Sequence, residues 1–396
     1  MIQKRNLRRF LLKTFRQPGY ALGVARKRAL AYLMYLGGSG RSRLPESLTL
    51  FLTHRCNLQC KMCGQWGEAG VTRKNPAGAS GKELSLETYR RLLEEIGPYK
   101  PNITLFGGEP LLYPHAVELI EQIKRKKMHC LMITNGALLS GCAQKLVESG
   151  LDELNVSLDG DRSVHDGIRG MPGLFEKIMA GLQAIAEHKS RLGLARPLVH
   201  LQCTINSGNF MYLDVVPAVA RRARADALTF HHLIHLDRSE LEAQERLCAQ
   251  LGCSGAGWQG FVFGHGIDVG VLKEQLGRAS AQAAGPAIDV YPAFSPEEID
   301  RYYNISGNYS EYNSYSSYSN YCKSIGARCL SPWIAGYLFP GGDLRPCLNL
   351  DYSFGNIGEQ PLRAVWNSPS ARRFRRFLKV QRLFPACARC TELYRY

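Results

Sequence analysis

The sequence predicts an α/β protein built on a parallel β-sheet that is wrapped by helices. After residue 46, short apolar segments with strand character alternate with longer segments of helical periodicity. Six such strand–helix units with short connections are typical of a parallel sheet, because parallel strands need a crossover between them. The pattern alone does not separate an open, doubly wound sheet from a partial barrel. The expected strands are residues 48–53, 103–106, 131–134, 154–158, 198–205 and 228–234.

Helical periodicity fills the intervals between these strands. The first helix, expected over residues 86–96, has Ser85 as its N-cap and the pair Gly97 and Pro98 as its stop. Each helix follows one strand and precedes the next, so its apolar face is expected to cover the sheet. The other expected helices are residues 116–126, 143–148, 174–188 and 211–222.

Composition divides the chain into four parts. Residues 1–45 form a basic segment, and residues 46–240 carry the strand–helix units. Residues 241–321 are rich in Gly, Ala and Ser and end with tyrosine at every third position from 309 to 321. The Asn and Ser residues between these tyrosines are poor helix formers, so we expect a loop-like connector, a tether rather than a substrate-covering lid. Residues 322–396 form a short C-terminal part that contains cysteines.

Length and composition describe an ordinary globular protein with an unusual charge. The 396 residues are 45% apolar and 21% charged, which is enough to bury a large core. The formal net charge is +16, and eleven Lys and Arg residues precede the first acidic residue, Glu46. Apolar residues such as Phe10, Leu12 and Phe15 lie between them.

Two interpretations of residues 1–45 remain open. A basic amphipathic segment can bind an anionic membrane surface, and it can equally form a helix whose apolar side packs on the main domain. Residues 7–13 resemble a twin-arginine export signal only faintly, and the apolar run 29–36 is too short to cross a bilayer. We therefore expect a cytoplasmic protein without an export signal or transmembrane anchor. A peripheral position at the inner face of the membrane is the alternative.

The thirteen cysteines favour metal binding over a disulfide framework, because their number is odd and no export is expected. Cys56, Cys60 and Cys63 follow the first strand in one tight loop. Three thiolates can hold three irons of a [4Fe–4S] cluster and leave the fourth iron open to another ligand. A zinc knuckle is the alternative. It needs a fourth ligand nearby, and the nearest candidate, His54, lies on the preceding strand.

The context of this loop resembles the radical S-adenosylmethionine superfamily. The spacing C-x3-C-x2-C after a first strand is followed, after a second strand, by the sequence GGEP at residues 107–110. The resemblance covers residues 46–240 and implies a partial (β/α)6 TIM-like barrel with its chemistry at the carboxyl ends of the strands. It also implies a [4Fe–4S] cluster on the three cysteines. That cluster would cleave S-adenosylmethionine reductively to a 5′-deoxyadenosyl radical, which abstracts a substrate hydrogen atom.

The resemblance assigns several contacts to S-adenosylmethionine. Met62 occupies the position near the adenine. Gly107, Gly108 and Glu109 match the motif that receives the methionyl amino group, where glycine lets the backbone approach closely.

Further matches lie where the next strands end. Asn135 ends the third strand, and Ser157 and Asp159 end the fourth, where the family contacts the ribose and methionine. Arg169 follows and is expected to pair with the methionyl carboxylate, which suits a guanidinium. Each residue also has a plain structural interpretation, since Asn and Asp beside glycine are ordinary turn residues. Their joint position at successive strand ends favours the functional one.

A second set of cysteines lies in the C-terminal part, with the spacing C-x12-G-x4-C and then C-x2-C. This pattern resembles the twitch domain, the shorter relative of the SPASM domain, and implies one auxiliary [4Fe–4S] cluster. A full SPASM domain would carry more cysteines, and only six residues follow Cys390. A zinc ribbon is the alternative that spacing leaves open. The implied ligands are Cys329, Cys347, Cys387 and Cys390.

The remaining cysteines have less defined roles. Cys322 is a spare thiol that can replace Cys329 as a ligand. The others are expected to be buried or inert: Cys130, Cys142, Cys203, Cys248 and Cys253.

The substrate is expected to be a peptide, because many SPASM and twitch enzymes modify ribosomally made peptides. A lipid or membrane-associated intermediate and small-molecule dehydrogenation are the alternatives. Leu348 stands where some related maturases place a proton-removing acidic residue, and the nearest carboxylate is Asp351, which disfavours a sulfatase-maturase-like dehydrogenation.

The remaining partners follow from the same resemblance. A reductant such as flavodoxin or ferredoxin is expected to supply electrons. Nucleic acid is not expected, since no aromatic RNA-reading motif accompanies the positive charge. A non-enzymatic iron–sulfur scaffold would need no S-adenosylmethionine site and is disfavoured.

Overall fold

The computed structural model describes residues 18–74, 76, 81, 83–282, 285–303, 322, 324 and 326–395. Within them, one sheet runs in the order β10-β9-β8-β1-β2-β3-β4-β5-β6-β7. In this spatial order, the strands from β8 through β1 to β7 pair in parallel with their neighbours. β9 pairs antiparallel with β8, and β10 pairs antiparallel with β9. The predicted α/β class with a mostly parallel sheet is confirmed. The first six strands are β1 (Ser47–Phe51), β2 (Asn102–Phe106), β3 (Cys130–Thr134), β4 (Glu153–Ser157), β5 (Leu198–Thr204) and β6 (Ala227–His231).

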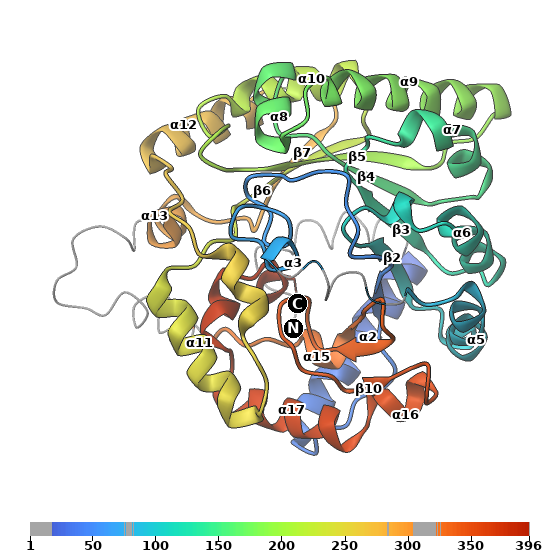
Figure 1. Ribbon diagram of the computed structural model, residues 1–396, viewed down its shortest axis with the longest axis vertical. Coiled ribbons are helices and arrows are strands. Elements are labelled where there is room, and N and C mark those ends of the chain that lie inside the picture. Colours follow the sequence, from blue (N-terminus) through green and yellow to red (C-terminus); the bar gives the residue numbers. More distant parts are fainter. Residues whose placement is uncertain are drawn as a thin grey trace.

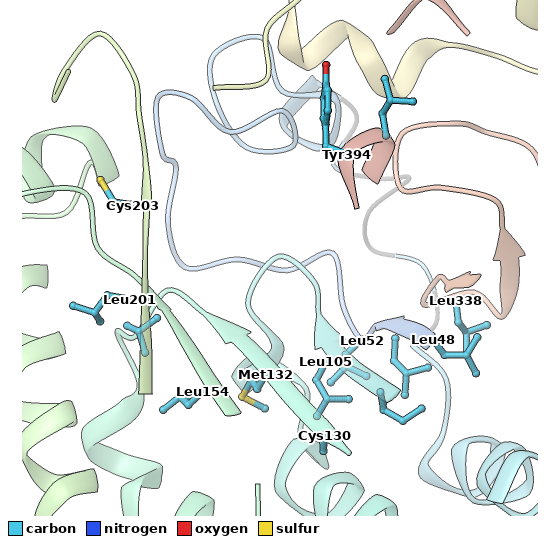
Figure 2. Close-up of a cluster of buried hydrophobic side chains, with 14 of the residues drawn as sticks. Leu48, Leu52, Leu105, Cys130, Met132, Leu154, Leu201, Cys203, Leu338 and Tyr394 are labelled. Atoms are coloured by element: carbon cyan, nitrogen blue, oxygen red, sulfur yellow. The ribbon is translucent and has the colours of Figure 1, made fainter. Parts of the chain in front are cut away.

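One face of this sheet is apolar and buried, whereas the other is partly exposed. Buried and partly exposed residues alternate along β2 to β5, as successive side chains of a strand point to opposite faces. The register places Leu105, Met132 and Leu154 next to one another across β2, β3 and β4, and Figure 2 shows these side chains along the strands. Helices cover the buried face, so the partly exposed residues face the inside of the barrel.

The strands form an arc with helices along its outer side and the C-terminal part opposite (Figure 1). The first of these helices begins after Ser85, whose side chain accepts a hydrogen bond from the N–H of Thr88, and ends at Gly97. The helices are α5 (Leu86–Ile96), α6 (Ala116–Arg125), α7 (Leu139–Glu148), α8 (Arg162–Arg169), α9 (Leu174–Leu192) and α10 (Val216–Arg222). All but α8 lie where the sequence predicts a helix.

The segment after β6 differs from the expected connector because it contains regular structure. β7 (Ala287–Tyr291) pairs in parallel with β6 and extends the sheet by one strand. Three helices flank it: α11 (Arg238–Leu251), α12 (Val269–Ser280) and α13 (Pro296–Tyr303). The tyrosine-rich run, residues 304–321, lies outside the described residues.

The C-terminal part joins the barrel through the sheet itself. β8 (Ala335–Leu338) pairs in parallel with β1, so residues some 290 positions apart become neighbours. The remaining strands there are β9 (Asp343–Arg345) and β10 (Gly355–Asn356). Its helices are α15 (Ser331–Ile334), α16 (Leu362–Trp366) and α17 (Pro369–Gln381), followed by the 3-10 turns Pro385–Arg389 and Thr391–Tyr394. The short helix α3 (Val71–Lys74) follows the cysteine loop.

The N-terminal helix α2 (Pro18–Gly37) packs its second half on the C-terminal part. The ring centroid of Tyr35 lies 5.1 Å from that of Trp333, and the hydroxyl of Ser42 donates to the Trp333 carbonyl (2.7 Å). Leu33 and Leu36, in contrast, are 59% and 50% exposed. These contacts favour the packed interpretation for residues 31–45. No described helix is both long and apolar enough to span a bilayer.

Candidate functional site

Cys56, Cys60 and Cys63 lie in one loop directly after β1. The N–H of Cys63 donates to the carbonyl of Cys60 (3.0 Å), which closes a turn between them. The Sγ of Cys63 accepts from the N–H of Trp66 (3.4 Å), and the Sγ of Cys56 accepts from the N–H of Leu58 (3.5 Å). Backbone N–H groups thus point at two of the sulfurs.

The backbone of Gly107 and Gly108 runs in contact with the start of this loop. The N–H of Gly108 donates to the Thr53 carbonyl (2.8 Å), and the N–H of Glu109 donates to the Arg55 carbonyl (2.8 Å). A Cβ on Gly108 would lie only 2.2 Å from the Arg55 oxygen, and one on Gly107 would lie 2.7 Å from the Thr53 oxygen. No side chain fits at either position unless the loop moves.

The Glu109 side chain is fully buried and bonded to the protein. Its Oε1 accepts from the Thr134 hydroxyl (2.8 Å) and the Leu111 N–H (3.1 Å), and its Oε2 accepts from the Asn135 N–H (2.8 Å). Burial raises the pKa of this carboxyl. In this structure Glu109 fixes the turn after β3, so a direct contact of its carboxylate with a ligand remains only a prediction.

Asn135 connects this turn to the cysteine loop. Its Nδ2 donates to the Oδ1 of Asn57 (2.8 Å) and lies 3.9 Å from the Sγ of Cys56. Its Oδ1 accepts from the N–H of Ala137 (2.9 Å), so the side-chain amide is held at both ends. Asn135 therefore lies beside the first cysteine site, and its predicted contact with S-adenosylmethionine stays a prediction.

Asp159 holds Arg169 beside the cysteine loop. The fully buried carboxylate accepts from the Nε of Arg169 (2.6 Å) and the N–H of Thr204 (2.9 Å), so both oxygens are engaged. The Nη1 of Arg169 lies 3.7 Å from the Sγ of Cys60. Burial lowers the pKa of this guanidinium, but the nearby Asp159 and Cys60 outweigh burial and the net pKa is raised. Asp159 thus orients Arg169, and its predicted contact with S-adenosylmethionine stays a prediction.

The other two predicted contact residues lie nearby. Met62 is half-buried within the cysteine loop and packs against the core. Ser157 is the last residue of β4 and pairs in register with Gln202 of β5, on the partly exposed face of the sheet. Both positions are compatible with contact to a ligand in the barrel.

Sequence reasoning missed several polar groups around this site. The side chains of Gln202 and His231 hydrogen-bond to each other across β5 and β6, and the His231 ring lies 5.9 Å from that of Tyr291 on β7. These residues face the inside of the barrel. His165 accepts from the Asp159 N–H (3.1 Å), and the Nδ2 of Asn209 donates to the Asp159 carbonyl (2.9 Å). The strict alternation of β5 and β6 was the signal that could have identified the first pair.

The four C-terminal cysteines gather around one cavity of about 30 Å³. Its other walls are largely apolar and include Pro332, Leu350 and Phe374. The N–H of Cys390 donates to the carbonyl of Cys387 (3.0 Å), which closes the C-x2-C turn. The cysteines that line the cavity are Cys329, Cys347, Cys387 and Cys390. Cys322 is buried elsewhere in the core and is not among the described residues that line it.

Helix α11 supports this second site through buried polar contacts. The Oε1 of Gln244 accepts from the N–H of Ala386 (3.0 Å), one residue before Cys387. Arg389 and Glu240 form a buried ion pair with 3.1 Å between Nε and Oε1. The segment expected to be a connector thus holds the C-x2-C turn in place.

The chemistry of both donor sets fits iron–sulfur ligation. Burial raises the pKa of Cys56 and Cys347 to about 12, so these thiols are uncharged at neutral pH unless a cation binds. A bound metal removes this penalty because a coordinated thiol is deprotonated. Three thiols leave one iron open, whereas four complete a cluster. Among the described residues, no group of three or more His, Cys, Asp or Glu is arranged to hold a single metal ion, so the fit rests on donor type and placement.

The fold and the two cysteine sets define an α/β barrel protein with two sites suited to iron–sulfur clusters. Residues 50–200 match the family model of the Radical SAM superfamily, and residues 329–391 match that of SPASM, an iron–sulfur cluster-binding domain. Residues 50–200 therefore form a radical SAM domain, and residues 329–391 form a C-terminal SPASM domain. These domains imply a [4Fe–4S] cluster with S-adenosylmethionine and auxiliary iron–sulfur binding.

The relatives include heme-related synthases and a bacteriocin biosynthesis protein. Fe-coproporphyrin III synthase of Methanosarcina barkeri is 30% identical over 53% of this chain and 52% of its own length. The AdoMet-dependent heme synthase of the same organism is 34% identical over 36% of this chain and 39% of its own length. The chain thus spans about half or less of these relatives. The subtilosin biosynthesis protein AlbA of Bacillus subtilis is 22% identical, but over 86% of this chain and 64% of its own length.

Solved structures show the same fold. Streptococcus suis SuiB bound to the precursor peptide SuiA superposes with a TM-score of 0.58 at 15% identity and covers 91% of this chain and 72% of SuiB. Native anSMEcpe with bound AdoMet superposes with a TM-score of 0.51 at 14% identity and covers 83% of this chain and 82% of its own. The partial barrel followed by the C-terminal domain is therefore a shared architecture.

Proposed function

We propose that this protein cleaves S-adenosylmethionine reductively and uses the resulting 5′-deoxyadenosyl radical to abstract a hydrogen atom from a peptide. The observation that carries this proposal is the cysteine loop after β1, packed against Gly107 and Gly108 and flanked by Arg169. When bound, the cluster supplies the electron that breaks the carbon–sulfur bond.

The residues of this chain bind and orient the ligands. Cys56, Cys60 and Cys63 hold the cluster, and the backbone at Gly107 and Gly108 receives the methionyl amino group. Arg169 offers its guanidinium to the methionyl carboxylate, because a planar fork suits a carboxylate. Asp159 acts behind it by holding the Nε of Arg169 at 2.6 Å.

Other residues complete this binding site. Met62 lies near the adenine, and Asn135 and Ser157 contact the cofactor from the ends of β3 and β4. Glu109 acts through the turn that carries Asn135, since its carboxylate accepts the Asn135 N–H.

The C-terminal domain binds one auxiliary [4Fe–4S] cluster. Support comes from the single cavity that the four cysteines share. The ligands are Cys329, Cys347, Cys387 and Cys390. Leu348 packs among apolar residues and Asp351 pairs with Arg345 (3.0 Å) while remaining 62% exposed, so neither offers a buried base beside the cluster.

A peptide substrate is favoured by the extent of the likeness. AlbA and SuiB align with 86% and 91% of this chain, and their names or titles refer to a bacteriocin and a precursor peptide. The polar inner face of the barrel, with Gln202 and His231, supplies hydrogen-bonding groups for a peptide.

A tetrapyrrole, as a small-molecule substrate, is the second candidate. It is favoured by the sequence identity of 30–34% to the heme-related synthases, which exceeds the 22% to AlbA. A reductant such as flavodoxin or ferredoxin would serve either reaction. Lipid-associated chemistry depends on membrane contact through residues 1–45.

The proposal is tested with anaerobically reconstituted, reduced protein. It should convert S-adenosylmethionine to 5′-deoxyadenosine and methionine, and the triple variant C56A/C60A/C63A should lose this turnover. Cys142→Ala, which removes a thiol outside both sites, is the matched control and should keep it. With a deuterated candidate precursor peptide, deuterium should appear in 5′-deoxyadenosine. Equal turnover by the triple variant would contradict the proposed function, and transfer only from a deuterated tetrapyrrole would favour the second candidate.

A further inference from the structure

Two cysteines outside both cluster sites meet at the C-terminal end of α11. The N–H of Gly252 donates to the carbonyl of Ala249 (3.0 Å), and the N–H of Cys253 donates to the carbonyl of Cys248 (3.2 Å). Gly252 has a φ of 70°, in the left-handed region. These features define a Schellman motif, in which the side chains of the first and sixth residues contact each other. Here both of these residues are cysteines.

The two sulfur groups form a small hydrogen-bonded unit. The Sγ of Cys253 donates to the carbonyl oxygen of Cys248 (3.5 Å). The Sγ of Cys248 also accepts from the Nε2 of Gln244 (3.2 Å). Cys248 is fully buried, whereas Cys253 is half-buried. Cys253 is thus the more exposed residue of the pair.

This thiol pair adjoins the auxiliary site without lining its cavity. The N–H of Asp351, four residues after Cys347, donates to the carbonyl of Ser254, the residue after Cys253 (3.3 Å). Gln244 bonds the Cys248 sulfur with one end of its amide, and with the other it accepts from the N–H of Ala386, next to Cys387. One side chain therefore links the pair to the C-x2-C turn.

We propose that Cys248 and Cys253 are a redox-active dithiol, which low-molecular-weight disulfides such as oxidised glutathione convert to an intramolecular disulfide. Cys253 first takes up one glutathionyl group as a mixed disulfide, and the other half leaves as a thiol. Cys248 then attacks the Cys253 sulfur and displaces the second glutathione as a thiol. One S–S bond breaks and one forms, two protein thiols are oxidised, and their hydrogens end on two glutathione molecules.

Disulfide formation has a consequence for the auxiliary site. The Cys248 sulfur turns toward Cys253 and gives up the hydrogen bond from Gln244, which loosens the support of Ala386. The C-x2-C turn then releases iron more readily. This coupling rests on the proposed auxiliary cluster, whereas the disulfide itself does not. Transient, sensing disulfides of this kind are the type found in reducing compartments.

The test uses the anaerobically reconstituted full chain and oxidised glutathione. After quenching with an alkylating agent and digestion with trypsin, both cysteines fall on the single peptide 247–273. This peptide should lose two hydrogen atoms and escape alkylation, while Cys130 and Cys142 remain alkylated. Dithiothreitol should restore the dithiol. Iron release to a chelator should become several-fold faster after oxidation, and C253S should abolish this acceleration.

Three outcomes would overturn the proposal. The peptide 247–273 could keep two free thiols at every ratio of oxidised to reduced glutathione, which would make the pair an ordinary apolar contact of a Schellman motif. The disulfide could instead join Cys253 to Cys347. Finally, C253S could lower the iron content of the unoxidised protein, which would make Cys253 a cluster ligand. If wild-type protein binds no iron but still forms the disulfide, the proposed auxiliary cluster is contradicted and the proposed dithiol is supported.

Discussion

Gly108 shows how closely single atoms constrain the first site. Its backbone lies where a Cβ would come within 2.2 Å of the Arg55 carbonyl oxygen, in the segment that leads to the cysteine loop. Gly108→Ala should therefore destabilise the protein by about 1–3 kcal/mol and reduce 5′-deoxyadenosine formation, because the loop must shift. Gly141→Ala in α7, where a Cβ meets nothing within 4 Å, is the control. It should be neutral or stabilising by up to about 1 kcal/mol. Thermal unfolding and 5′-deoxyadenosine formation are measured for both variants. Equal stability and turnover of the two would contradict the close contact between Gly108 and the Arg55 carbonyl.

The pair of Asp159 and Arg169 gives a second prediction at this scale. Asp159→Asn removes the charge that holds a buried guanidinium, and breaking such a pair costs about 3–5 kcal/mol. We expect a lower free energy of unfolding in urea and weaker binding of S-adenosylmethionine. Asp161→Asn, two residues away at the N-cap of α8, is the matched control, since both residue types cap helices well. Unchanged binding in Asp159→Asn would show that Arg169 needs no such orientation.

Cysteine positions and glycine motifs could be predicted from the sequence because their spacing is local. The hydrogen-bond partners of Asp159 could not be predicted in this way. Its carboxylate bonds to Arg169 on α8 and to the backbone of Thr204 on β5, and these contacts arise only from the packing of three elements. The hydrogen bond between Gln202 and His231 could not be predicted for the same reason, since neither residue lies in a recognisable motif.

At the scale of elements, the strands up to β6 and most helices between them follow from periodicity and capping. The elements after β6 were missed because Gly, Ala and Ser dominate the composition there and hide the pattern. Local caps were nevertheless present. Asp237 and Glu240 form a capping box at the start of α11, and Asp268 caps α12. Both signals could have identified these helices.

Helix α2 carries a prediction about the N-terminal segment. Deleting residues 1–45 should destabilise the protein, because Tyr35 and Ser42 pack and bond on Trp333. Deleting residues 1–17 should leave stability and turnover unchanged. It should weaken salt-sensitive binding to anionic liposomes, since six of the eleven basic residues lie there and each contributes about 1 kcal/mol near such a surface. Sedimentation with liposomes and thermal unfolding are the measurements. Full-length protein that ignores anionic liposomes at low salt would remove the basis for a lipid substrate.

At the scale of the whole molecule, the sheet brings the two cysteine sites into one framework. β8 pairs with β1, so the chain that leads to Cys347 runs beside the strand that leads to Cys56. The sequence indicates both sites but not this adjacency, because a strand pairing over some 290 residues leaves no local pattern.

The central claim is that two separate four-iron clusters are held by two separate cysteine sets. Iron and zinc per chain, with cluster type read by Mössbauer spectroscopy, test it most directly. Wild-type protein should hold about eight irons, and removal of either set should leave about four. Of the two variants, only the one that lacks Cys329, Cys347, Cys387 and Cys390 should still cleave S-adenosylmethionine. Stoichiometric zinc in native protein, with iron unchanged when the C-terminal set is removed, would contradict the claim.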